Sequence, residues 1–143
     1  VILTPLPETD AAATARVRAM WEVAGARVVE MEPKHHDEVL AATSHLPHVL
    51  AFTLVESLAR LHDKKEIFEY AAGGFRDFTR IASSDPVMWR DICLANGDAI
   101  QYMIDRFIGD LQTLSQAVHA HDGQQLLDIF TAAKAARDRF VGN

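Results

Sequence analysis

Only two short segments of this chain, both close to its N-terminus, have the composition of β-strands. Residues 1–3 precede a turn that contains two prolines, and residues 26–31 follow Gly25. The residues between them have helical periodicity, and Thr9 or Asp10 can cap the predicted helix. One strand–helix–strand unit is a single crossover of a parallel sheet, which needs more strands and covered faces. We therefore expect residues 1–33 to be the last piece of an α/β domain whose earlier part lies upstream.

From Pro33 onward, every extended apolar pattern is helical, which predicts an all-helical domain over residues 34–143. Pro47 falls inside the first helix and is expected to kink it. The broad apolar stripe of the helix at 98–119 is wide for so small a domain and favours a second subunit as partner. The expected helices are 36–61, 66–71, 75–83 after a break at Gly73-Gly74, one starting at Pro86, 98–119, and a last one after Gly123 that includes Val141.

Composition limits the classes of partner. A net charge of −6 without a basic tract argues against nucleic acid or an anionic membrane as a main partner. No apolar run approaches the roughly 18 residues of a membrane span, and the N-terminus lacks a signal-peptide pattern, so we expect no membrane span. The single cysteine fits a reducing compartment, so we expect a cytoplasmic protein.

Three polar side chains with binding chemistry share one side of the first long helix. Ser44 and His48 are four residues apart, and His45 is three residues from His48. They flank Pro47, where unpaired backbone groups can be satisfied by a side chain, water or ligand. The alternative is that both histidines are satisfied by local hydrogen bonds. A metal site is disfavoured because no third ligand has suitable spacing.

Arg76 and Arg80 lie four residues apart on a short helix whose other side carries Phe75 and Phe78. Two guanidinium groups on one face repel each other unless an anion lies between them, and their planar fork suits a carboxylate. That anion could equally be an acidic side chain such as Asp77.

Four further residues could support this site. Gly73 and Gly74 permit a close backbone approach or a positive φ. Trp89 could form a platform for a ligand, or simply belong to the core, and His36 could assist the site or lie in a solvated helix start. Together with Ser44, His45, His48, Arg76 and Arg80, these residues describe a pocket suited to a small dicarboxylic acid.

Two ordered motifs carry a family resemblance. His-Asp-Glu-Val at 36–39 with Ser-His-Leu-Pro-His at 44–48, followed by the segment from Gly73 to Trp89, resembles the prephenate/arogenate (cyclohexadienyl) dehydrogenases. The resemblance implies a mainly helical fold: a dimerisation domain like the C-terminal domain of 6-phosphogluconate dehydrogenase, preceded by a β-α-β remnant of a Rossmann domain. It implies oxidative decarboxylation of prephenate or arogenate in tyrosine biosynthesis, with NAD or NADP as the hydride acceptor.

By this resemblance, Arg80 corresponds to the arginine that binds a substrate carboxylate, and Ser44, His45 and His48 to residues around the substrate. Arg76 corresponds to a basic position that reaches a partner subunit's pocket and is lysine in many relatives. The resemblance places the catalytic histidine and the glycine-rich cofactor loop upstream, so no catalytic residue is assigned in these 143 residues.

The leading hypothesis is therefore a fragment that binds substrate and forms a homodimer but is inactive alone. The alternative is a non-catalytic helical dimer that binds a prephenate-like or tyrosine-like effector. The sequence does not decide between prephenate and arogenate or between NAD and NADP, and it leaves tyrosine inhibition open.

Overall fold

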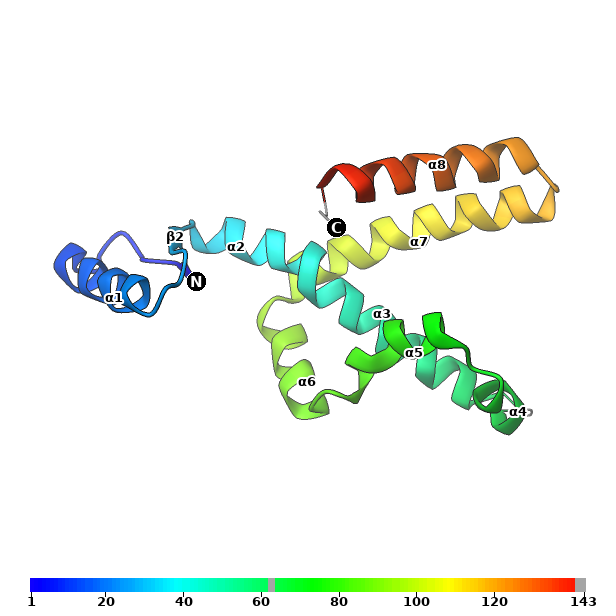
Figure 1. Ribbon diagram of the computed structural model, residues 1–143, viewed down its shortest axis with the longest axis horizontal. Coiled ribbons are helices and arrows are strands. Elements are labelled where there is room, and N and C mark those ends of the chain that lie inside the picture. Colours follow the sequence, from blue (N-terminus) through cyan, green and yellow to red (C-terminus); the bar gives the residue numbers. More distant parts are fainter. Residues whose placement is uncertain (62–63, 141–143) are drawn as a thin grey trace. The chain divides into compact units, whose positions relative to one another are not determined.

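A computed structural model describes residues 1–61 and 64–140 (Figure 1), so the predicted contribution of Val141 to the last helix lies outside the described residues. The chain forms two compact units, Val1–Met103 and Ile104–Asn143. A separate domain boundary near residue 33 stays a prediction. The elements in chain order are β1 (Ile2–Leu3), α1 (Ala11–Val23), β2 (Val29–Glu30), α2 (Pro33–Leu40), η1 (Ala41–His45), α3 (Leu46–Ala59), α4 (Lys64–Glu69), α5 (Gly73–Thr79), η2 (Arg80–Ser83), α6 (Pro86–Ala95), α7 (Gly97–His119) and α8 (Gly123–Phe140).

The N-terminal segment is the predicted parallel β-α-β unit. Strands β1 and β2 pair in parallel, with Ile2 opposite Val29. Asp10 caps α1 by accepting a hydrogen bond from the Ala12 N–H at 2.7 Å. Gly25, at φ +83°, ends the helix with two bonds of a Schellman motif, its own N–H to Glu22 and the next N–H to Trp21. No residue of α1 is buried, so the helix is not covered by another described element.

The long helix begins three residues earlier than predicted. Pro33 is its first residue and Glu32 is the N-cap, accepting a hydrogen bond from the His35 N–H at 2.8 Å. These bonds from the backbone N–H groups of Lys34 and His35 lower the pKa of Glu32. His36 therefore lies inside the first turn of α2 instead of starting the helix.

Pro47 acts on the turn that precedes it. Because proline has no N–H to donate to Thr43, the helix cannot keep its regular ladder there. The five residues of η1 form a π-helical turn instead, closed by a hydrogen bond from the Leu46 N–H to the Ala41 carbonyl. The ribbon changes direction between α2 and α3 (Figure 1), so the predicted disturbance takes the form of a wide turn with a bend.

The uninterrupted helical run Pro33–Ala59 is, by length and composition alone, apolar enough to cross a membrane, contrary to the expectation from the sequence. A helix in a protein core passes the same test. In this fold α3 packs against α5 and η2, and Leu46 and Ala51 on it are buried. The finding therefore gives only weak support for a membrane span.

The segment between α3 and α7 corrects two details of the sequence reading. Gly73 and Gly74 do not separate two helices; they form the first turn of α5. Neither has a positive φ, and a Cβ added at either position would meet no atom within 4 Å. Phe78, on the side of α5 that was expected to face the core, is 44% exposed, whereas Phe75 on the same helix contacts Phe68 of α4 with ring centroids 5.9 Å apart. The Asp85 cap followed by Pro86 starts α6 as predicted, with bonds from the N–H groups of Val87 and Met88.

The second unit contains α7 from Ile104 onward and α8, and the chain reverses direction between these two helices (Figure 1). Asp122 accepts a hydrogen bond from the Gln125 N–H and starts α8. Among described residues 104–140, only Ala117 is a buried apolar residue. Large apolar side chains on both helices are instead exposed: Ile108, Leu111, Val118, Leu127, Phe130 and Phe140.

Candidate functional site

The predicted histidines gather around one indole ring. His48 stacks on Trp89, with ring centroids 3.9 Å apart and planes inclined by 20°. His45 meets the same indole edge-on at 6.1 Å. Trp89 is 8% exposed, so it is the core residue that the sequence allowed for, and it also supports both imidazoles. Its Nε1 atom has no hydrogen-bond partner among the described residues.

The π-helical turn and its proline determine how His48 is held. The Nδ1 atom of His48 lies 2.8 Å from the carbonyl oxygen of Ser44. A carbonyl oxygen only accepts, so Nδ1 carries a proton and the neutral ring has a lone pair on Nε2. The Ser44 hydroxyl itself forms no hydrogen bond within the described part of the chain and remains available to a ligand.

His45 is held by a residue that lies much later in the chain. Its Nδ1 lies 3.2 Å from Nδ2 of Asn96, which the sequence reading did not identify. Burial is the largest effect on its pKa, which lies below the ordinary value for histidine; the charge of Asp37 opposes this shift. The ring is therefore held toward its neutral form.

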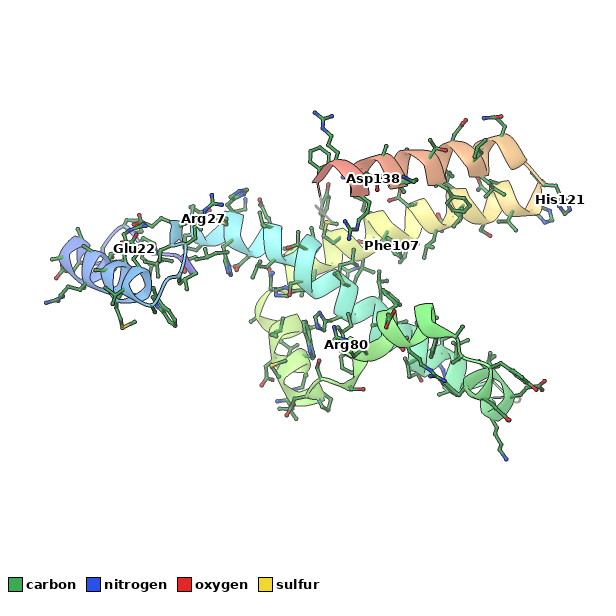
Figure 2. The ribbon with its side chains drawn as sticks, in the orientation of Figure 1. Glu22, Arg27, Arg80, Phe107, His121 and Asp138 are labelled. Atoms are coloured by element: carbon green, nitrogen blue, oxygen red, sulfur yellow. The ribbon has the colours of Figure 1, made fainter. Side chains whose placement is uncertain are left out.

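The two arginines have no acidic partner in the part of the chain that the structure describes. Within residues 1–61 and 64–140, neither Arg76 nor Arg80 forms an ion pair, so the alternative of neutralisation by Asp77 is not realised. Arg80 begins η2, which packs on α3, and its side chain lies between the ribbons of α5 and α6 in Figure 2. Arg76 is exposed on α5 and makes no recorded contact with either imidazole.

The structure thus brings together part of the predicted set. His45, His48 and Trp89 are in contact, Ser44 is joined to His48, and Arg80 lies on an adjoining element. The other members are more peripheral. His36 bonds its neighbour Asp37 at 3.0 Å on α2, and Gly73 and Gly74 lie exposed at the start of α5. Among the described residues, no three metal-binding side chains gather.

A hollow of about 810 Å³ lies outside the histidine cluster, between α2 and the start of α7. Its charged residues are Lys34 together with Asp37, Glu38 and Asp98. This excess of carboxylates repels an anionic ligand. We therefore place the candidate site at the histidine cluster, because its side chains suit an anionic ligand and those of the hollow do not.

The cluster can bind an aromatic acid. Arg80 supplies a cation for a carboxylate, and the Ser44 hydroxyl and the two Nε2 atoms supply hydrogen-bonding groups. Trp89 and the imidazoles supply flat apolar surface for a ring. Such groups can bind a ligand of this kind and orient its ring.

The lowered pKa of His45 predicts a pH dependence of stability. Between the folded-state pKa and the higher unfolded-state pKa, the unfolded chain binds more protons, so the free energy of unfolding falls as pH falls. We expect the wild type to lose more stability than His45→Gln between about pH 7.5 and about pH 5.5. Urea unfolding at both pH values measures this difference, and equal losses in the two proteins would contradict it.

Comparisons with known proteins agree with the fold and the motifs. Residues 32–132 match the family model described as prephenate dehydrogenase, dimerization domain. The chain is 45% identical over 139 residues to the cyclohexadienyl dehydrogenase of Zymomonas mobilis, covering 96% of this chain and 47% of that protein. This chain belongs to the prephenate dehydrogenase family and contains its dimerization domain.

Two solved structures have the same fold. The prephenate dehydrogenase of Aquifex aeolicus, in complex with hydroxyphenyl propionate and NAD+, matches with a TM-score of 0.88 and 39% identity over 95% of this chain and 48% of its own. The Synechocystis arogenate dehydrogenase matches with a TM-score of 0.84 and 25% identity over 97% and 51%. The chain thus spans about half the length of these relatives, and its predicted helical fold with a small parallel sheet is confirmed.

Proposed function

We propose that this chain is the substrate-binding and dimerising part of an NAD(P)-dependent prephenate or arogenate dehydrogenase of tyrosine biosynthesis. The observation that carries the proposal is the cluster of His45 and His48 on Trp89, in a chain of this family, with Arg80 on an adjoining element and without an ion pair to any described residue. Arg80 binds a ligand carboxylate, while Ser44 and the two imidazoles contact the ring substituents. Hydroxyphenyl propionate, bound by the Aquifex relative, has this combination of an aromatic ring and a carboxylate.

The described residues do not fit a dinucleotide. Among the described residues, two connections lead from a parallel strand into a helix, and neither is a glycine-rich loop. The connection between β1 and α1 contains Pro5, Pro7 and Glu8, and the one between β2 and α2 consists of Met31 and Glu32. Two prolines remove backbone donors and a carboxylate repels a pyrophosphate. We therefore assign the cofactor to another part of the protein and derive no reaction step through it from these residues.

Two uncovered surfaces of the chain suit association with a cofactor-binding domain and with a second subunit. A two-stranded sheet with an uncovered helix needs further strands, which suits association with a nucleotide-binding domain. The α7–α8 unit buries one apolar residue among its described positions and exposes six large ones, which suits a second copy of the chain. We propose a homodimer through this unit, in a cytoplasmic protein.

The test is NAD(P)+-dependent oxidation by the intact protein, followed by the absorbance of the reduced cofactor, with prephenate and arogenate supplied separately. We expect turnover of at least one substrate, and none by residues 1–143 alone. Binding without turnover by the intact protein would instead support a non-catalytic effector-binding dimer. Turnover by residues 1–143 alone would contradict the assignment of the cofactor to another part of the protein.

A further inference from the structure

Asn96 lies at a rigid junction close to the histidine cluster. Its N–H donates to the Ile92 carbonyl at the end of α6, and its carbonyl accepts from the Ile100 N–H at 3.1 Å in the first turn of α7. Its side chain is half-buried and reaches two elements that are distant in sequence. The two backbone bonds fix the main chain of Asn96, and the two side-chain contacts restrict its amide.

The orientation of the Asn96 amide follows from its partners. Its Nδ2 lies 2.8 Å from the backbone carbonyl oxygen of Asp37, and that oxygen can only accept. The NH₂ group therefore faces α2, which fixes the amide against the flipped alternative. The same Nδ2 lies 3.2 Å from Nδ1 of His45 and donates there as well.

A donor facing Nδ1 determines where the imidazole proton resides. Nδ1 of His45 must accept, so the proton of the neutral ring is on Nε2, across the ring from Asn96. His48 has the opposite arrangement, because its Nδ1 donates to the Ser44 carbonyl and its Nε2 is left as an acceptor. The two neighbouring rings thus offer one Nε2 donor and one Nε2 acceptor.

We propose that Asn96 is a positioning residue that fixes His45 as an Nε2–H donor toward the ligand, and so sets the donor–acceptor polarity of the histidine pair. This inference rests on the proposed function for the identity of the ligand. The groups around the His45 ring are consistent with it: Asp37 presents its backbone carbonyl to Asn96, and Trp89 presents only an indole to the imidazole. The charged or titratable neighbours of His45 are Asp37, His36 and His48.

Asn96→Asp tests the proposal, because it keeps the size of the side chain but replaces the NH₂ donor with an acceptor. The carboxylate draws a proton onto Nδ1 of His45, by changing the tautomer or by charging the ring. Asn96→Ala removes the donor without imposing the opposite polarity. In the intact protein we expect Asn96→Asp to lower kcat/KM at least about 10-fold more than Asn96→Ala does.

A double-mutant cycle with His45→Gln separates positioning from a structural role. The Gln side chain has an NH₂ donor and no ring tautomer, so in that background Asn96→Asp and Asn96→Ala should have nearly equal effects. A readout that does not depend on turnover is the imidazole ¹⁵N chemical shifts of His45. We expect an unprotonated Nδ1 in the wild type and a protonated Nδ1 in Asn96→Asp.

The outcomes distinguish this proposal from the proposed function. An inactive wild type with an unprotonated Nδ1 would overturn the dehydrogenase assignment and leave the tautomer assignment standing. A protonated Nδ1 in the neutral wild-type ring would overturn the role of Asn96, whatever the activity. Equal effects of Asn96→Asp and Asn96→Ala in the wild-type background would also overturn it.

Discussion

Arg80→Ala is expected to weaken the binding of hydroxyphenyl propionate to the intact protein by about 10- to 150-fold, the equivalent of a hydrogen bond to a charged group. The reason is that Arg80 has no acidic partner in the described residues and lies on η2, packed against α3, the helix that carries His48. Truncation therefore removes a cation that no neighbour replaces. Isothermal titration calorimetry measures the dissociation constant directly.

Two further variants make this result specific. Arg80→Lys keeps the charge but loses the bidentate fork, so its loss of affinity should be smaller than that of Arg80→Ala. Arg60→Ala is the matched control, because Arg60 is exposed at the end of α3 and already pairs with Glu56 at 2.8 Å. Arg60→Ala should bind normally. An Arg80→Ala protein within twofold of the wild type would show that the carboxylate is bound elsewhere.

Phe130→Asp is expected to convert the homodimer into monomers. Phe130 is 57% exposed on α8, and its burial against a second copy contributes about 1.5–3 kcal/mol. A twofold interface contains the change twice, and the new carboxylate would be desolvated without a partner. The dissociation constant should therefore rise by at least about 100-fold, which sedimentation equilibrium measures.

Ala135→Asp serves as the control for Phe130→Asp. It places the same charge on the same helix, five residues further on and therefore on the opposite side. This protein should remain dimeric. A Phe130→Asp protein that sediments as a dimer would move the interface away from the exposed face of α8.

The sequence predicts best where the structure depends on neighbouring residues. Asp10, Gly25, and Asp85 with Pro86 each determine a helix end through bonds to residues two to five positions away, and all of these helix ends were predicted. The start of α2 was placed too late because Pro33 at the first helical position, with Glu32 before it, was not recognised as an N-terminal signal.

The candidate site was only partly predictable, because its geometry depends on contacts between distant residues. The spacing of Ser44, His45 and His48 placed them together on a helix. The stacking of His48 on Trp89 joins residues 41 positions apart, and the bond from Asn96 to His45 joins residues 51 positions apart. Periodicity contains no information on such pairs. The one signal for Asn96 was its place just after the last apolar turn of α6, a position where Asn is one of the residues that can end a helix.

The wide turn at Ala41–His45 also determines the directions in which residues of α3 face relative to those of α2. A π-helical turn contains about one residue more than an α-helical turn, which corresponds to roughly 100° of rotation. Residues on either side of it, such as Asp37 and His48, therefore face directions that a regular helix would not give them. Deleting one residue of this turn would leave the apolar composition almost unchanged but rotate α3 relative to α2. The length of this segment thus determines where His48 faces, in addition to the residue types that the segment contains.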